Sequence, residues 1–398
     1  MNIADRIDKL GNGIFHRNDF HKIQYQQNFL INNLPALIDL SLGSTDLPPP
    51  KSVLDVINES LYESNSSSYS LYSSTSPFRE VVSSWAKQRL GVDVDPDKEV
   101  LLLIGSQDGT SHMPLASINP GDSALILDPS YPSHRGGLIL ADADIQKITL
   151  KQKKDWRPDF NCLTTSQLEE IKMMIFGFPH NPTAQVGEQS WLEEAMHYSK
   201  RNNIIFVHDN PYLDLVIEGE APSLLRCQGW KEHGIEFFSL SKSWCMGGQR
   251  IGFAIGAEPL LSGLRKVKGV VDFNQFLPIQ KGAMEALSNC YDWPGRVTSI
   301  YKERRDRAVL LLNNFGWEVP VPKMAMYLWL PLPKWAKDKG MDDESFTLDL
   351  LRKKGVALTP GSGFGLGGAN WVRMALVQPL SIIDEALGRI ESWWNENT

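Results

Sequence analysis

The segment around Lys242 carries the residues best suited to chemistry. Lys242 follows an apolar run over residues 235–240 and stands beside Ser239 and Ser241, and Arg250 comes eight residues later, after a pair of glycines. Because an ammonium group is costly to bury without a partner, a lysine directly after a buried strand is unusual. One interpretation is covalent catalysis, in which the lysine amine attacks a carbonyl carbon while the serine hydroxyls and Arg250 hold a phosphate. A surface loop with an ordinary lysine and arginine is the alternative.

Four further apolar runs, over residues 100–104, 124–127, 173–178 and 204–208, end in polar turns. These turns are Gly105-Ser106-Gln107-Asp108-Gly109, Asp128-Pro129-Ser130-Tyr131, His180-Asn181-Pro182-Thr183-Ala184 and Asp209-Asn210-Pro211-Tyr212. A helix start can bind phosphate through its backbone N–H groups, and an aromatic ring can stack on a flat ligand. A carboxylate can pair with a protonated ring nitrogen. Each turn also occurs in proteins without a ligand, so none of them is decisive alone.

Arg373 lies inside another apolar run, over residues 371–376. A buried guanidinium without a partner would be severely destabilising. Its planar fork fits a carboxylate with two hydrogen bonds, so a partner of that kind is expected. The partner is either the carboxylate of a ligand or a carboxylate of the protein itself.

Taken in order, these motifs resemble those of the class I/II aminotransferases of fold type I, which depend on pyridoxal 5'-phosphate. The family's Ser-x-Ser-Lys-(x)7-Arg-x-Gly segment matches at Lys242, and its Asp-x-x-Tyr pattern matches at Asp209 and Tyr212. Its Asn-Pro-Thr-Gly turn is present with Ala184 in place of glycine. The resemblance runs from Gly43 to Arg373 and is greatest to aminotransferases of the diaminopimelate and succinyl-diaminopimelate type.

The resemblance implies a role for each group around the pyridine ring. Lys242 would hold the cofactor through an imine and then move the proton from the substrate Cα. Asp209 would pair with the ring nitrogen, and Tyr131 would stack on the ring face. Tyr212 and Asn181 would hydrogen-bond the ring oxygen, and Asn181 would also contact the substrate carboxylate.

The same resemblance implies contacts to the phosphate and to the substrate. The phosphate contacts fall on Ser106, Gln107, Ser239 and Arg250. The substrate carboxylate would be bound by Arg373 and by the backbone of Gly43. We expect Met324, Met326 and Tyr327 to line the side-chain pocket, in which we find no second arginine for a distal carboxylate.

A Ser-rich stretch, residues 63–76, contains two tyrosines. The spacing from Tyr69 to Phe78-Arg79 resembles the family's Tyr-(x)8-Leu-Arg segment, whose tyrosine reaches the phosphate in the other subunit. Ser74 replaces the family's glycine, which leaves Tyr72 as an alternative to Tyr69. The match implies a homodimer with active sites shared across a two-fold interface.

The spacing of apolar runs predicts an α/β protein. Seven runs between residues 100 and 255 alternate with helical patterns, which predicts a mainly parallel seven-stranded sheet with helices on both faces. A long helix over 293–315, strands over 327–330, 356–359 and 371–376, and helices over 343–353 and from 381 predict a smaller α+β domain. We therefore expect an N-terminal arm with one short helix and part of the small domain (1–42), a large cofactor-binding domain (43–282) and a small C-terminal domain (283–398).

Composition excludes several classes of protein. The chain of 398 residues has a formal net charge of −7, which gives no electrostatic footprint for nucleic acid. No apolar run approaches the length of a membrane span, and the first residues carry no apolar signal region. Four cysteines, Cys162, Cys227, Cys245 and Cys290, have neither disulfide-like nor metal-like spacing. We expect a cytoplasmic protein without metal, membrane or nucleic-acid partners.

The function predicted from the resemblance is transfer of an amino group from an L-amino acid to a 2-oxo acid, with 2-oxoglutarate and glutamate as one pair. The reaction would run in ping-pong fashion through the cofactor at Lys242. Two alternatives stay open: a lyase acting at the substrate Cβ or Cγ on the same scaffold, and a non-enzymatic regulator that binds pyridoxal phosphate.

Overall fold

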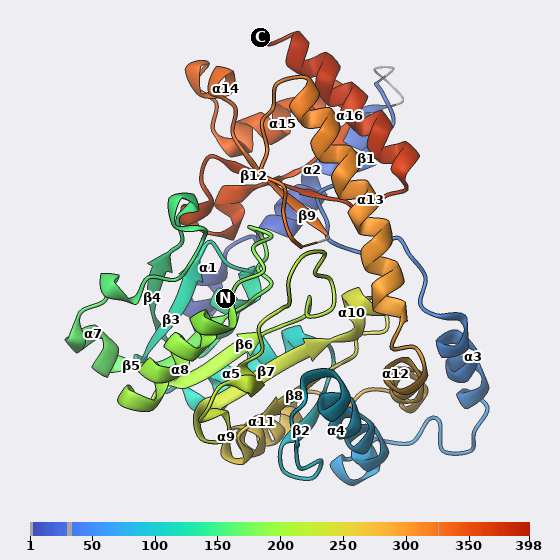
Figure 1. The fold of residues 1–398 in the computed structure, drawn as a ribbon, viewed down its shortest axis with the longest axis vertical. Helices are drawn as coiled ribbons and strands as arrows, with labels where there is room; N and C mark the ends of the chain where they lie inside the picture. The colour runs from blue at the N-terminus through green and yellow to red at the C-terminus, as the bar shows by residue number, and fades with distance from the viewer. Residues whose placement is uncertain (1–2, 30–33, 325) are drawn as a thin grey trace.

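A seven-stranded sheet forms the centre of the protein (Figure 1). The structure is a computed structural model that describes residues 3–29, 34–324 and 326–398. The strands of this sheet are β2 (Val100–Leu103), β3 (Ser123–Asp128), β4 (Asp144–Thr149), β5 (Ile171–Phe176), β6 (Ile205–Asp209), β7 (Gly234–Ser239) and β8 (Gly252–Gly256). Their order is β2-β8-β7-β6-β5-β3-β4, and the neighbours run parallel except at β8, which is antiparallel to β2 and β7.

Helices cover both faces of the sheet, which explains why its strands are apolar at consecutive positions. Leu101 and Leu103 pack on the side of α5 (Ser106–Ser117), α6 (Pro132–Leu140) and α11 (Glu258–Val271). Leu102, between them, packs on the side of α4 (Ser76–Leu90), α8 (Gln189–Asn202) and α12 (Leu277–Asn289). Burying each such leucine stabilises the fold by about 1.5–3 kcal/mol. A strand that slid along its neighbours would expose these side chains, so the register of the sheet is fixed and the carboxyl ends of its parallel strands form one edge.

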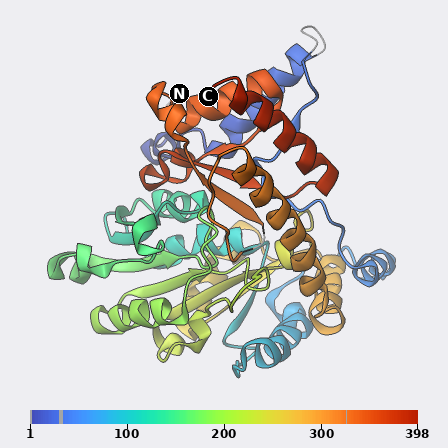
Figure 2. The same ribbon diagram turned by 45° about the horizontal axis from the view of Figure 1, so that its top comes forward.

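A second group of elements forms a smaller layer above that edge (Figure 1). Strands β9 (Tyr327–Pro331), β11 (Thr359–Pro360) and β12 (Trp371–Ala375) form an antiparallel sheet. The N-terminal strand β1 (Ile38–Asp39) pairs in parallel with β10 (Val356–Ala357). The helices here are α2 (Ile14–Phe29), α14 (Lys334–Asp338), α15 (Asp343–Lys354) and α16 (Leu380–Asn395). Helix α13 (Trp293–Asn314) rises from α12 to pack against α16, as both views show (Figure 2).

The predicted fold class is confirmed, because each of the seven expected strands lies within two residues of an observed one. The prediction of one short N-terminal helix was wrong, since the arm forms α1 (Asp5–Leu10) as well as α2. Helix α1 buries no side chain and α2 buries few, Ile14 and Tyr25 among them, so their apolar spacing is a weak signal. The three-part division of the chain into domains stays a prediction. Within the described ranges, no helix is both long and apolar enough to cross a membrane.

Candidate active site

A cavity of about 290 Å³ lies at the carboxyl ends of the sheet strands. Every predicted site residue except Tyr69, Met324 and Met326 lines it, which brings together groups from positions 43 to 373. These residues are Gly43, Ser106, Gln107, Tyr131, Asn181, Asp209, Tyr212, Ser239, Lys242, Arg250, Tyr327 and Arg373.

Lys242 stands on the one-turn helix α10 (Leu240–Ser243), which begins directly after β7. The helix is capped by Ser239, whose Oγ accepts a hydrogen bond from the backbone N–H of Ser241 at 3.2 Å. The Lys242 ammonium reaches into the cavity and donates to the carbonyl oxygen of Gly43. Burial lowers the pKa of Lys242, and the nearby Arg373 and Arg250 lower it further. This environment favours the neutral amine, which is the nucleophilic form of lysine.

Asp209 ends β6, the strand beside β7, so its carboxylate faces the same cavity as Lys242. One oxygen, Oδ2, lies 3.1 Å from Nε2 of His134. The other, Oδ1, is buried and has no hydrogen-bond partner in the described part of the chain. An unpaired buried carboxylate oxygen is costly, and a cationic ring N–H is a partner that would satisfy it.

The turn after β2 forms another part of the cavity wall, at the same edge of the sheet. Helix α5 begins at Ser106, which lines the cavity, and the free N–H groups of a helix start can bind a phosphate. Gly105 has a φ of +78°, and a Cβ there would lie 2.8 Å from Nη2 of Arg250. Glycine is therefore required if the guanidinium is to approach the turn. Tyr131 Oη donates to Oε1 of Gln107 at 3.3 Å, and burial raises the pKa of Tyr131 to about 12.

Arg373 enters the cavity from β12 and is 1% exposed. Its Nη1 donates to Oδ1 of Asn181 at 2.8 Å, and its Nη2 donates to the carbonyl oxygen of Ser41 at 2.6 Å. The guanidinium carbon lies 4.5 Å from the ring centroid of Tyr327 and 4.8 Å from that of Phe364. No carboxylate within the described ranges forms an ion pair with it, so the alternative of a protein salt bridge is not supported there.

Tyr327, on β9 of the small layer, contacts Tyr212, which follows β6 of the large sheet. Its hydroxyl lies 3.0 Å from that of Tyr212, whose pKa is raised well above its ordinary value by burial and by this neighbour. A Cβ on Gly43 would lie 1.9 Å from the Tyr327 hydroxyl, so a side chain at position 43 would collide with the Tyr327 ring where it now stands. The Tyr212 hydroxyl also accepts from Nδ2 of Asn181 at 3.4 Å.

Tyr69 lies outside the cavity of its own chain. Its side chain is 86% exposed, and its ring lies 6.0 Å from that of Phe273. Tyr72, the alternative, donates its hydroxyl to the carbonyl oxygen of Asp97, and its ring lies between the guanidinium groups of Arg79 and Arg265. Tyr72 is therefore part of the packing, whereas Tyr69 is available to another molecule.

Phe15 and His134 are among the cavity residues that sequence reasoning missed. Phe15 comes from the N-terminal arm, and no local pattern connects it to residues more than a hundred positions away. His134 stands one turn after Tyr131 on α6, a spacing that places both side chains on one face and could have been noticed. The expectation for Met324 and Met326 was wrong, because both are fully buried in the core of the small layer, where apolar strands leave no route to the cavity.

The sequence profile of the family described as Aminotransferase class I and II matches residues 35–390. The chain belongs to this family. It is 34% identical over 357 residues to an LL-diaminopimelate aminotransferase of Halothermothrix orenii, covering 89% of this chain and 90% of that protein. It is also 34% identical to the glutamate-pyruvate aminotransferase AlaC of Escherichia coli, with 89% and 86% covered.

A solved structure gives the same result. A probable N-succinyldiaminopimelate aminotransferase from Thermus thermophilus superimposes with a TM-score of 0.88 at 39% identity, covering 95% of this chain and 99% of that one. The protein is therefore an aminotransferase that depends on pyridoxal phosphate and acts on small amino and oxo acids. The cavity fits the cofactor, since it offers a nucleophilic lysine, an unpaired carboxylate oxygen for a ring N–H, and a helix start with Arg250 for a phosphate.

Proposed function

We propose that Lys242 holds the cofactor covalently and that the enzyme moves an amino group from an L-amino acid to a 2-oxo acid in ping-pong fashion. The observation that carries the proposal is the Lys242 amine, which has a lowered pKa and stands directly after β7, the strand next to that of Asp209. When bound, pyridoxal phosphate supplies an electron sink for the bonding electrons of the substrate Cα–H.

The residues of the chain then have separate tasks. Lys242, freed by the incoming amine, takes the proton from Cα and returns it on the cofactor side. Asp209 holds the proton on the ring nitrogen, and His134 fixes the carboxylate by its 3.1 Å contact. Tyr212 and Asn181 hydrogen-bond the ring oxygen, and Tyr131 covers the ring face.

The substrate carboxylate is bound by Arg373 from the small layer. Its two Nη groups are already aimed by Asn181 and Ser41, and the surrounding aromatic rings exclude water. A guanidinium oriented before the substrate arrives loses little freedom on binding, which favours a correctly placed Cα–H. The backbone of Gly43 lies beside the same position.

The phosphate is assigned to Ser106, Gln107, Ser239 and Arg250, at the start of α5 and the end of β7. For the substrates, we propose glutamate and 2-oxoglutarate as one pair, which the likeness to a glutamate-pyruvate enzyme supports. The names of other relatives make diaminopimelate and its succinyl form the first donors to test.

We also propose a homodimer in which Tyr69 reaches the cofactor phosphate of the other subunit. Exposed apolar side chains lie at the end of α11 and where the segment after it meets the Ser-rich loop. They include Val270 at the end of α11 and the contacting pair Phe273 and Tyr69, which are 89%, 48% and 86% exposed. An exposed apolar patch beside a ligand site is typical of a protein interface. A cytoplasmic location stays a prediction.

The covalent attachment is tested by reducing the loaded protein with borohydride and mapping the modified peptide. We expect the phosphopyridoxyl group on Lys242 of the wild type and no modification of Lys242→Ala. Modification of another lysine would contradict the proposal. A half-reaction with a panel of L-amino acids, followed by cofactor absorbance, then identifies the donor, and release of ammonia without an oxo acid would indicate a lyase instead.

Subunit mixing tests the role of Tyr69. In a heterodimer of Tyr69→Ala and Lys242→Ala chains, one site contains both intact residues if they come from different subunits. Random reassortment should then restore about a quarter of the wild-type activity, because half of the dimers each gain one intact site. No gain over the Tyr69→Ala protein alone would contradict sharing of the site, and Tyr72→Phe serves as the matched control.

A further inference from the structure

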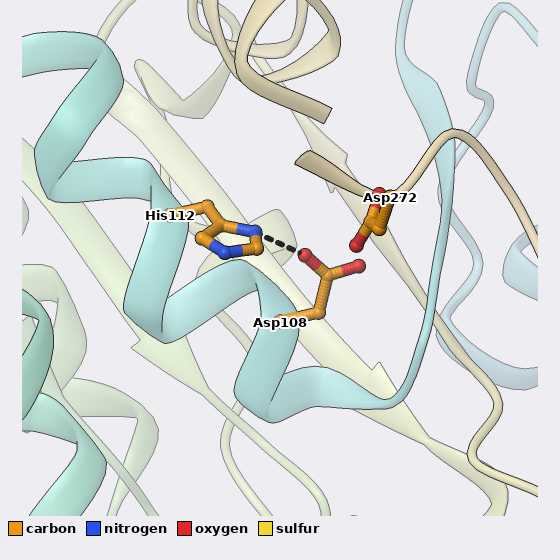
Figure 3. Close-up of side chains that lie close together, drawn as sticks. All are labelled: Asp108, His112 and Asp272. Carbon is orange, nitrogen blue, oxygen red and sulfur yellow. Dashed lines mark hydrogen bonds and ion pairs between the residues drawn. The ribbon is translucent and has the colours of Figure 1, made fainter. Parts of the chain in front are cut away.

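A buried group of charged side chains lies directly behind the start of α5 (Figure 3). Asp108, two residues into that helix, is 8% exposed and is not among the residues that line the cavity. Its Oδ2 accepts from the backbone N–H of Ile104 at 2.8 Å and from Nζ of Lys268 at 2.5 Å. Its Oδ1 lies 2.6 Å from Nδ1 of His112, one turn later, and Asp272 lies on its other side.

Lys268, on α11, supplies the positive charge of this group. It is only 2% exposed, and its ammonium also donates to Oδ1 of Asp272 at 2.9 Å. Asp108, His112 and Asp272 are of the types that bind metal ions, but the lysine ammonium already stands between the two carboxylates. The group is therefore a buried ion-pair network, in which removal of one member leaves the others uncompensated.

The Asp272 side chain connects this network to the loop after α11, and the backbone carbonyl oxygen of Lys268 also holds that loop. This oxygen accepts from the backbone N–H groups of Asp272 and Phe273 at 3.0 and 2.8 Å. The Phe273 ring packs on Tyr69, and the next residue, Asn274, donates to the carbonyl oxygen of Ser70 at 2.9 Å. The loop thereby fixes the backbone that carries Tyr69.

The following residue of the same loop fixes the other side of the phosphate position. Gln275 donates through Nε2 to the carbonyl oxygens of Gln249 and Arg250, at 2.8 and 2.6 Å. Arg250 has a φ of +53°, a left-handed conformation that an arginine rarely adopts without external hydrogen bonds. Lys268 therefore stands where the start of α5, the Arg250 turn and the Tyr69 loop are joined.

We propose that Lys268, with Asp108 and Asp272, is a positioning residue for the phosphate side of the cofactor site. The inference depends on the proposed function, since it takes the phosphate to lie between Ser106 and Arg250. The network holds the backbone N–H groups of α5 and the Arg250 turn at a fixed separation, and it touches none of the groups assigned to the pyridine ring.

The test compares the affinity of the apo-protein for pyridoxal phosphate with its affinity for pyridoxal, which lacks the phosphate. In Lys268→Met we expect pyridoxal phosphate to bind about 10- to 100-fold more weakly, while the Kd for pyridoxal changes by less than about three-fold. Lys266→Met, an exposed lysine on the same helix, is the matched control and should leave both constants unchanged.

Asp272→Asn keeps the pair between Lys268 and Asp108 and is the second variant, should Lys268→Met not fold. We expect the same selective loss for pyridoxal phosphate at about 3- to 10-fold. Equal loss for both ligands, or no loss for either, in a folded variant would overturn the inference. A wild-type protein that does not bind pyridoxal phosphate at Lys242 would overturn the proposed function first.

Discussion

The two sides of the cavity are built in different ways. On the cofactor side, each group stands within a few residues of the carboxyl end of a strand in one sheet: Ser106 after β2, Tyr131 after β3, Asn181 after β5, Asp209 on β6 and Lys242 after β7. On the substrate side, Phe15, Gly43, Tyr327 and Arg373 come from both ends of the chain. The first side depends on sheet register, whereas the second depends on how distant segments pack.

This difference should separate the kinetic effects of substitutions. Groups aimed by the sheet act on the cofactor ring, so their loss should lower kcat. Groups brought by the small layer orient the substrate, so their loss should raise KM.

The largest effect is expected for Asp209→Asn, on the cofactor side. The amide keeps the shape of the carboxylate but cannot hold a proton on the ring nitrogen, so we expect kcat to fall by about 10²- to 10³-fold with KM little changed. Steady-state kinetics at saturating cofactor measures this effect, with borohydride reduction as the control for attachment at Lys242. An unchanged kcat would show that the Asp209 carboxylate is not needed to keep the ring nitrogen of the cofactor protonated.

A smaller effect, and of the opposite kind, is expected for Arg373→Lys. An ammonium cannot reproduce the planar fork, so we expect kcat/KM to fall by about 10- to 100-fold, mostly through a higher KM. Arg307→Lys, at an exposed pair with Asp384 on the same layer, is the matched control. A drop in kcat at unchanged KM would contradict the division between the two sides.

Lys242, on the cofactor side, donates a hydrogen bond to the carbonyl oxygen of Gly43, on the substrate side. Burial of the Lys242 ammonium should destabilise the apo-protein. Because the pKa of Lys242 is lowered on folding, the unfolded chain binds more protons between the folded value and about 10.5, and stability rises with pH across that window. Lys242→Met should therefore be more stable than the wild-type apo-protein by about 1 kcal/mol below that window, with the advantage lost as the pH approaches the upper limit. Urea unfolding over a pH series measures the difference, and a constant advantage would contradict the assigned cause.

The smallest effect concerns Ala184, which ends the Asn181 turn with a φ of +57°. Glycine there would relieve the left-handed strain but would lose a buried methyl group and gain freedom in the unfolded chain. We expect these effects to cancel to within about 0.5 kcal/mol, whereas Ala195→Gly, at a buried helical position of α8, should cost about 1–2 kcal/mol. Denaturant unfolding of both variants makes the comparison, and equal losses would show that no strain is stored in the turn.

The cofactor side could be predicted from the sequence because its signals are local. An apolar run of four to six residues, then a turn with a polar or aromatic group, specifies both the strand and the position of the side chain. Arg373 was also predictable, since a guanidinium inside an apolar strand requires a buried partner.

Phe15 could not be predicted, because its place depends on packing between α2 and the small layer rather than on its neighbours in the chain. The same reason explains the error at Met324 and Met326. They stand beside Tyr327, but the strand pairing of β9 with β12 decides which side chains face the cavity. The network around Lys268 was missed as well, since its members are 160 residues apart.

The close approach of Tyr327 to Gly43 has a practical consequence for altering the substrate range. In a saturation library at position 43, we expect glycine to be almost the only residue among active variants. Every larger residue would displace the Tyr327 ring, whose hydroxyl contacts that of Tyr212. Diversity is better introduced at Phe15, whose ring reaches the cavity from a helix that supplies none of the residues assigned to the cofactor or to the substrate carboxylate.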